Sequence, residues 1–334
     1  MPRSVEMRYP ARVLLGQFPT PIEELARLSK HLGGPAIYAK RDDQTGLATG
    51  GNKTRKLEFL LADAQTQGCN HLITMGAPQS NHCRQTAAAA VRCGMDCSIV
   101  LSGEPPEHKL GNLLLDELLG ATVHWSGSRT RETAADELLA ISRKEGRRPY
   151  LVPLGGSSPV GALGYVMGMQ EAMWQLEAQR LPIDTMVLAS SSAGTQAGLV
   201  LGARLFGYPG AVLGISVDAS ATDLTKRVRQ IAMGSARLLG LNGTINEEDL
   251  GVEVNADFLG GGYAVVGDLE REAIRTVART EGLLLDPVYT GRAMGALINL
   301  IGQRAFDRKQ RILFWHTGGT AALSAFADTL IAQK

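Results

Sequence analysis

The sequence predicts an α/β protein with two lobes, each built on an open, mostly parallel sheet. Apolar runs of strand length alternate with amphipathic stretches of helix length, and two glycine-rich segments interrupt this alternation. With 334 residues, 44% of them hydrophobic, the chain is long enough to bury a large core. Its 39 glycines and 5% aromatic content are more typical of a glycine-rich α/β enzyme than of a β-sandwich.

The elements can be read off in chain order. The strands are predicted at residues 36–38, 71–75, 96–101, 122–124, 150–152, 185–189, 212–217 and 312–316. The helices between them are predicted at residues 55–67, 85–93, 111–119, 134–145 and 161–179. Strand, helix and strand at this spacing indicate βαβ units, which place the strands parallel to one another.

The glycine-rich segments 49–52 (TGGN) and 154–159 (LGGSSP) are natural places for the backbone to pass between two lobes. We therefore predict a smaller α/β domain of residues 55–155 inserted into a larger one formed by residues 1–54 and 156–334. A cleft between two lobes is where a small ligand usually binds.

Charge and composition exclude several kinds of partner. Lys and Arg total 34 against 33 acidic residues, so no strong field attracts a nucleic acid or an anionic membrane, and we expect neither as a partner. The first residues lack the pattern of a signal peptide, and no apolar run is long enough to cross a bilayer. The four cysteines match no common zinc spacing, so we expect reduced thiols, no metal site and a cytoplasmic protein.

Lys53 follows two glycines and begins a predicted helix. The partial positive charge of a helix N-terminus lowers the pKa of a nearby ammonium, and such a lysine can form a Schiff base with an aldehyde cofactor. Taken alone, the segment favours the plainer interpretation, in which Lys53 and Lys56 are surface charges on an amphipathic helix.

Three further loops follow predicted strands. Residues 190–198 (SSSAGTQAG) offer small residues and hydroxyls to a single phosphate, although a plain N-capped turn is the alternative. In residues 76–85, Ser80 and Asn81 suit a helix N-cap or a carboxylate site, and Cys83 is interpreted as structural. The third loop, 316–320 (HTGGT), begins with His316, which alone is more often a satisfied core histidine than a catalyst. Tyr263 and Tyr289 lie in loops as well, where ordinary packing is the alternative to a site.

Taken together and in this order, these segments closely resemble the family of 1-aminocyclopropane-1-carboxylate deaminase and D-cysteine desulfhydrase. That family belongs to the tryptophan-synthase-β-like enzymes of pyridoxal 5′-phosphate (PLP) fold type II. The resemblance covers almost the whole chain, from about residue 18 to near residue 325, and is most specific at residues 50–59 and 79–90.

The resemblance implies a PLP enzyme that acts on a small amino acid and forms a homodimer, with the larger domain binding the cofactor. Lys53 would carry the cofactor and later move the Cα proton, and Asn81 would bond the pyridine 3′-oxygen. Tyr263 and Tyr289 would stand over the reacting carbons, with Ser80 also assigned to catalysis. The cofactor phosphate would be held by Ser192, Ala193, Gly194 and Thr195, and the substrate carboxylate by Ser80, Asn81 and His82.

Two positions separate the activities within the family. In the deaminases of the family that this chain resembles, Glu follows the tyrosine of the Asp-Pro-Val-Tyr motif and Leu follows the histidine of the His-x-Gly-Gly motif. Here those positions are Thr290, expected at the substrate, and Thr317, expected at the cofactor, and both resemble the desulfhydrases. A threonine makes the pyridine ring a weaker electron sink than a carboxylate does, which suffices to eliminate a good leaving group such as thiolate.

We therefore predict a carbon–sulfur lyase that converts D-cysteine to pyruvate, sulfide and ammonia. The alternatives within the family are an L-cysteate sulfo-lyase and the cyclopropane deaminase. A module that retains PLP and binds an amino acid without turning it over is the alternative outside enzymes. The family pattern is altered near the expected pocket at Ala264, Arg292 and Ala321, which leaves the substrate open.

Overall fold

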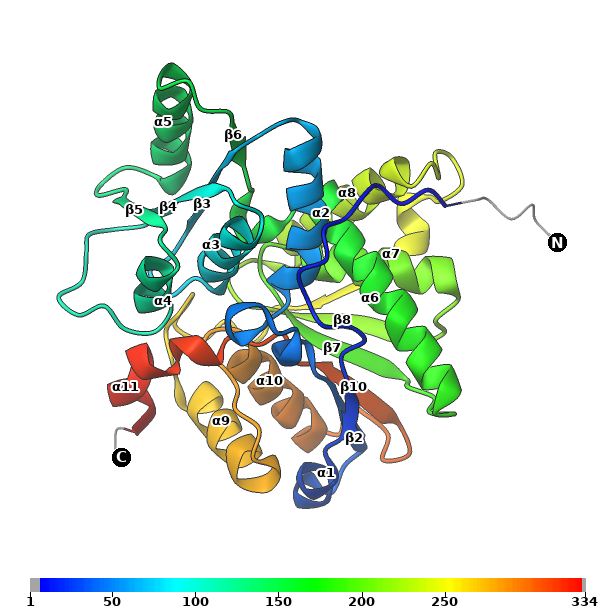
Figure 1. The fold of residues 1–334 in the computed structure, drawn as a ribbon. Coiled ribbons are helices and arrows are strands. Elements are labelled where there is room, and N and C mark those ends of the chain that lie inside the picture. The colour runs from blue at the N-terminus through cyan, green and yellow to red at the C-terminus, as the bar shows by residue number, and fades with distance from the viewer. Residues whose placement is uncertain (1–6, 332–334) are drawn as a thin grey trace.

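The computed structural model describes residues 7–331 and contains two sheets (Figure 1). The larger sheet has the strand order β1-β2-β10-β7-β8-β9, and the smaller has the order β5-β4-β3-β6. The larger sheet consists of β1 (Ile22–Glu24), β2 (Ala36–Lys40), β7 (Thr185–Ser190), β8 (Ala211–Ser216), β9 (Val252–Asn255) and β10 (Arg311–Trp315). The smaller consists of β3 (His71–Gly76), β4 (Asp96–Leu101), β5 (Thr122–Trp125) and β6 (Pro149–Leu151). Every pairing is parallel except that of the edge strand β1 with β2, so the predicted parallel architecture is confirmed.

Helices cover both faces of the larger sheet (Figure 1). One face packs against α6 (Pro159–Ala178), α7 (Gly194–Phe206) and α8 (Ala221–Leu238), and the other against α1 (Ala26–Leu32), α9 (Asp268–Glu281) and α10 (Thr290–Gly302). Successive residues of a strand point to opposite faces, so in β7 Met186 and Leu188 join the first layer while Val187 joins the second. Both faces are buried, which is why the central strands read as continuous apolar runs.

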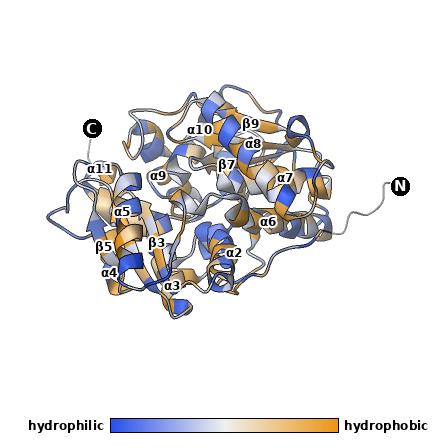
Figure 2. Ribbon diagram, turned by 90° about the horizontal axis from the view of Figure 1, so that it is seen from above, coloured by the Kyte–Doolittle hydropathy of each residue, from blue (hydrophilic) through white to orange (hydrophobic). Residues whose placement is uncertain are grey.

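The smaller sheet is also covered on both faces. Apolar residues of α2 (Lys53–Thr66), α3 (Asn81–Arg92) and α4 (Asn112–Leu118) form one layer, and α5 (Arg131–Lys144) packs on the other. The short C-terminal helix α11 (Ala327–Ile331) follows a 3₁₀ segment, Thr320–Phe326. α2 carries much blue in Figure 2 although most of its residues are buried, because several of them are charged.

Each of the eight strands predicted from the sequence is present, and β1 and β9 are additional. The additional strands are short edge strands of the larger sheet, and β1 has only three residues, too few to give a period-2 pattern. The five predicted helices correspond to α2 to α6, with shifts of a few residues at their ends. Strands β3 to β6 form one sheet and the remaining strands form the other, and the inserted domain of residues 55–155 stays a prediction.

Candidate active site

A cavity of about 260 Å³ opens where β3, β7 and β10 end and is lined by residues of both sheets' loops. The carboxyl ends of parallel strands are the usual position of a ligand site in open α/β sheets. The structure brings together all but two of the predicted site residues in its lining, namely Lys53, Ser80, Asn81, His82, Ser192, Ala193, Thr195, Tyr263, Tyr289 and Thr317. Gly194 and Thr290 are the two that do not line it.

Lys53 is the first residue of α2, and the loop before it is held in place by hydrogen bonds. The Asn52 amide donates to the Thr317 carbonyl at 3.0 Å, and the Gly51 amide donates to the Thr45 hydroxyl at 2.8 Å. Gly50 has a φ of 70°, and a Cβ there would lie 2.0 Å from the Asp43 carbonyl oxygen, so only glycine fits this turn.

The ammonium of Lys53 is destabilised chiefly by burial, which lowers its pKa to about 8. The Asp286 carboxylate opposes this shift, and the Arg84 guanidinium adds to it. The direction is the one predicted from the sequence, but the main cause is removal from water rather than the helix end. A lysine with this pKa has a substantial neutral fraction near pH 7 and can attack an aldehyde.

The loop between β7 and α7 forms the end of the cavity nearest Lys56. Ala193 has a φ of 72° and no side chain caps α7, so the predicted alternative of a plain N-cap does not apply. Within residues 7–331 the amides of Thr195 and Gln196 have no acceptor, and Asn52 Nδ2 donates to the Thr195 hydroxyl at 3.1 Å. Gly194 lies behind this surface, where its amide donates to Ser157 Oγ at 3.1 Å.

Lys56 is a buried lysine beside this loop, not the surface charge of the plainer sequence interpretation. Its Nζ donates to the Gly155 carbonyl and to Ser157 Oγ, each at 3.1 Å, and Ser157 Oγ lies 2.8 Å from Ser192 Oγ. Burial, followed by the charge of Lys53, lowers its pKa well below the usual range. No acidic side chain within residues 7–331 pairs with it, so an anion bound at the loop would be its nearest counter-charge.

The start of α3 forms the side of the cavity contributed by the smaller sheet. Ser80 caps the helix by accepting from the Cys83 amide at 3.2 Å, so the capping interpretation is confirmed, and Ser80 also lines the cavity. Asn81 Oδ1 accepts from Asn112 Nδ2 at 2.8 Å, which leaves Asn81 Nδ2 free to donate. His82 Nε2 lies 2.7 Å from the Thr74 hydroxyl, so its backbone amide, rather than its ring, is available to a carboxylate.

Two tyrosines of the larger lobe meet at the cavity. The hydroxyls of Tyr263 and Tyr289 are 2.6 Å apart, and their rings cross edge to face at a centroid distance of 6.0 Å. Burial is the main cause that raises the pKa of both phenols, so both are protonated at neutral pH. The pair can therefore hold or pass a proton at the cavity surface.

Thr290 and Thr317, predicted at the substrate and at the cofactor, differ in their relation to the cavity: Thr317 lines it and Thr290 does not. The Thr290 hydroxyl accepts from the Asp286 amide and donates to Asp286 Oδ1, each at 2.7 Å, and the side chain is fully buried. Thr290 therefore holds the turn before α10, and this geometry does not support its prediction as a substrate contact. Thr317 does line the cavity, and its hydroxyl has no protein partner within residues 7–331.

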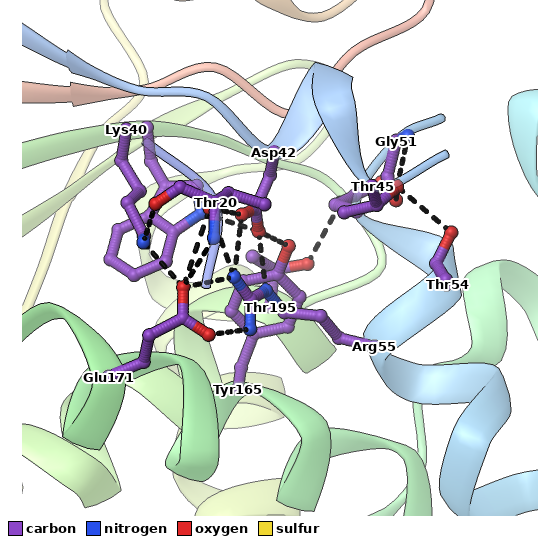
Figure 3. Close-up of polar contacts among 12 residues, drawn as sticks. Thr20, Lys40, Asp42, Thr45, Gly51, Thr54, Arg55, Tyr165, Glu171 and Thr195 are labelled. Carbon is purple, nitrogen blue, oxygen red and sulfur yellow. Dashed lines mark hydrogen bonds and ion pairs between the residues drawn. The ribbon is translucent and has the colours of Figure 1, made fainter. Parts of the chain in front are cut away.

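Next to Lys53 along α2, Arg55 enters a buried polar network that joins α2, α6 and the larger sheet (Figure 3). Asp42 is fully buried and accepts from Arg55 Nε and Nη2 at 2.8 Å, the Tyr165 hydroxyl at 2.6 Å and Trp315 Nε1 at 2.8 Å. Burial alone would raise the pKa of Asp42, but Arg55 and these hydrogen bonds bring it well below its usual range. The buried polar network comprises Thr20, Lys40, Asp42, Arg55, Tyr165, Glu171, Gln175 and Trp315.

Other side chains singled out in the sequence have structural roles. Both ring nitrogens of His316 are occupied, by the Leu284 carbonyl and the Gly318 amide, so the interpretation as a satisfied core histidine is confirmed. All four cysteines are free, and burial raises the pKa of the Cys83 thiol well above its usual range, which makes it unreactive. Within residues 7–331 no cluster of metal-ligating side chains is found, and none of the helices described there is long and apolar enough to cross a membrane.

The chain belongs to the family of pyridoxal-phosphate-dependent enzymes, whose family model matches residues 13–318. It is 42% identical to a "D-cysteine desulfhydrase" of Salmonella choleraesuis over 98% of this chain and 99% of that protein. It is 40% identical to a "Putative 1-aminocyclopropane-1-carboxylate deaminase" of Pyrococcus abyssi over 97% and 96% of the two chains. A crystal structure described as an "ACC deaminase homologue" superposes with a TM-score of 0.88 at 37% identity, covering 97% and 96%. The predicted fold of PLP type II is thereby confirmed, as is the family.

The cavity fits the cofactor that the family implies. Free amides at the start of α7, the hydroxyls of Ser192 and Thr195, and buried Lys56 match the needs of a phosphate group. The Ser190 hydroxyl is buried in the lining and has no hydrogen-bond partner among residues 7–331, as expected of a group that bonds to a ligand. Lys53, with its lowered pKa, would hold the aldehyde end. Lys56, Ser157 and Asn112 were missed from the sequence, because lysine in a helix and serine after glycine carry no local sign of burial.

Proposed function

We propose that this protein is a PLP-dependent lyase that converts D-cysteine and water to pyruvate, hydrogen sulfide and ammonia. The observation that carries the proposal is the chemistry around Thr317. This residue offers a hydroxyl at the position where the family's deaminases resemble one another in having leucine. Within residues 7–331 the neighbouring turn presents no carboxylate to the cavity, because the Asp286 carboxylate accepts hydrogen bonds from backbone amides and from the Thr290 hydroxyl. The 42% identity to a protein named D-cysteine desulfhydrase supports this substrate. Because two proteins named after the deaminase are 40% and 37% identical, the proposal depends on the site and not on sequence identity.

The residues of this chain have distinct tasks in the proposed reaction. Neutral Lys53 removes the proton from Cα, and its lowered pKa keeps enough of the amine unprotonated at neutral pH. The start of α3, with Ser80 and the Asn81 amide, orients the substrate carboxylate. The hydroxyl pair of Tyr263 and Tyr289 supplies a proton to the departing sulfur. When bound, the cofactor would supply an electron sink for the bonds at Cα, and Lys53 with the α7 start would hold it.

The test is to incubate the purified holoenzyme with D-cysteine, L-cysteine, L-cysteate and 1-aminocyclopropane-1-carboxylate and to identify each 2-oxo acid and each anion released. Pyruvate with sulfide from D-cysteine is the expected result. Sulfite and pyruvate from L-cysteate would move the activity to the sulfo-lyases, and 2-oxobutyrate would identify the deaminase. A protein that binds cofactor and amino acid but releases no product would be a binding module.

A further inference from the structure

Arg131 is a cation of the cavity that the proposed reaction does not use. It is the first residue of α5, on the smaller sheet, and its side chain lines the same cavity as Lys53. Apart from Lys53, it is the only lysine or arginine in the lining formed by residues 7–331. The α3 start and Ser80 already serve the substrate carboxylate, so the guanidinium provides a second, separate positive charge.

This guanidinium has no counter-charge among the residues that the structure describes. Arg129, two residues earlier in the same loop, pairs with Glu137, whereas Arg131 forms no ion pair or hydrogen bond of its side chain within residues 7–331. A half-buried arginine that faces a cavity without an acidic partner is typical of a site for an anionic ligand group.

The charge shares the cavity with the two tyrosines, since Arg131, Tyr263 and Tyr289 line the same cavity. Burial is the main cause that raises the pKa of Tyr263, and among the smaller influences Arg131 lowers it while Asp218 raises it. Asp218, the one acidic side chain in the described lining, accepts from Ser191 Oγ at 2.7 Å and so has a partner of its own.

We propose that Arg131 is a specificity-determining residue that receives an anionic group on Cβ of the substrate. This inference rests on the proposed lyase function and gives its substrate class: amino acids whose Cβ substituent is an anion or leaves as one, such as a thiolate or a sulfonate. An arginine fork pairs with such a group directly and favours the charge that develops on it as the Cα proton is removed and the Cβ bond breaks.

The experiment measures binding rather than turnover, with two ligands that differ in charge but hardly in shape. Aspartate carries a carboxylate on Cβ and asparagine a neutral amide, and neither contains a good leaving group. Each enantiomer is titrated by calorimetry into the holoenzyme and into the Arg131→Gln and Arg131→Lys variants. Arg129→Gln is the matched control, since it removes a charge from the same loop outside the cavity.

We expect the unaltered protein to bind one enantiomer of aspartate more tightly than the corresponding asparagine. Arg131→Gln should weaken aspartate about tenfold or more and leave asparagine within about twofold, because only aspartate loses a hydrogen bond between two charged groups. Arg131→Lys should recover part of the loss, and Arg129→Gln should change neither ligand.

Three results would overturn the proposal. The first is equal affinity of the unaltered protein for aspartate and asparagine. The second is equal weakening of both ligands by Arg131→Gln, which would place the guanidinium at the α-carboxylate or in a closing contact with Asp218. The third is no effect of Arg131→Gln. Sulfide release from D-cysteine, measured on the same preparations, tests the proposed function separately, because a charge preference that depends on Arg131 would stand without it.

Discussion

Lys53 and Arg55 lie two residues apart at the start of α2, yet the structure treats their charges in opposite ways. Arg55 is fully paired, with Asp42 and Glu171 accepting from every part of its guanidinium (Figure 3). Lys53 has no hydrogen-bond partner within residues 7–331, and burial lowers its pKa to about 8. One charge fixes α2 to the larger sheet, and the other is left available for chemistry.

The contrast extends to the surroundings of each residue. In the buried polar network every donor to Asp42 is a side chain held by packing, so the charges are stabilised and the helix is anchored. In the cavity the Ser190 hydroxyl has no partner, and the Thr317 hydroxyl and the α7 amides have none either within residues 7–331. A site with unsatisfied groups gains affinity for a ligand at the expense of stability.

The largest expected effect is that of Lys53→Ala on turnover. Removing the amine should lower kcat by about 10³-fold or more and remove the absorbance of covalently attached cofactor, since both the attachment and the Cα proton transfer are lost. The free energy of unfolding of the cofactor-free protein should not fall, because a poorly solvated ammonium is removed. Steady-state kinetics, absorbance spectra and denaturant unfolding measure this, with exposed Lys144→Ala as the control. An unchanged spectrum in Lys53→Ala would refute the assignment.

The matching change in the network is Asp42→Asn, which should act on stability. We expect the free energy of unfolding to fall by about 3 kcal/mol, at the low end for a broken buried pair because Glu171 still contacts Arg55. The pKa of Asp42 is depressed in the folded state, so its contribution is present above the unfolded value of about 3.9 and is lost as pH falls below it. Denaturant unfolding from pH 7 to pH 3 should therefore show less acid destabilisation for Asp42→Asn than for the unaltered protein. Parallel curves would contradict the network's role.

The tyrosine pair should follow the pattern of Lys53 and not that of Asp42. Tyr289→Phe or Tyr263→Phe should lower kcat by about 10²-fold, the size of one lost proton donor, while the free energy of unfolding changes by about 1 kcal/mol or less. Tyr150→Phe removes a hydroxyl that donates to Asp63 at 2.6 Å outside the cavity and serves as the control. Loss of stability without loss of turnover in Tyr289→Phe would make the pair structural.

The lowered pKa of Lys53 gives a pH dependence with a defined sign. Only the neutral amine attacks the cofactor aldehyde, so the rate of attachment to the cofactor-free protein should rise about tenfold from pH 6 to pH 7 and level off above pH 8. Stopped-flow absorbance measures this rate. A rise that continues to pH 10 would mean that Lys53 keeps an ordinary pKa, and the contrast with the paired charge of Arg55 would then disappear.

The sequence predicted the features that depend on local pattern. Apolar runs predicted eight of the ten strands described in residues 7–331. The resemblance to a known family placed Lys53 and the three strand-end loops at one site. The sequence did not predict that Lys56 is buried or that the Asp42 carboxylate accepts hydrogen bonds from four side chains, because such contacts join residues far apart in the chain. The charged residues at the start of α2 were predicted to be exposed for the same reason. The spacing and hydropathy of a segment do not show whether another element supplies a counter-charge.

Thr290 and Thr317 test this limit most sharply, since the sequence predicted both at the ligand and only Thr317 lines the cavity. Thr290→Val should lower the free energy of unfolding by about 1–3 kcal/mol, because the Asp286 amide and carboxylate each lose a partner, and should change kcat by less than about threefold. Thr317→Val should lower kcat and leave the free energy of unfolding unchanged, since Thr317 lines the cavity and its hydroxyl bonds nothing in the described protein. If Thr290→Val instead changed kcat and left stability intact, its hydroxyl would have to leave Asp286 in the working enzyme, and the substrate contact predicted from the sequence would be restored.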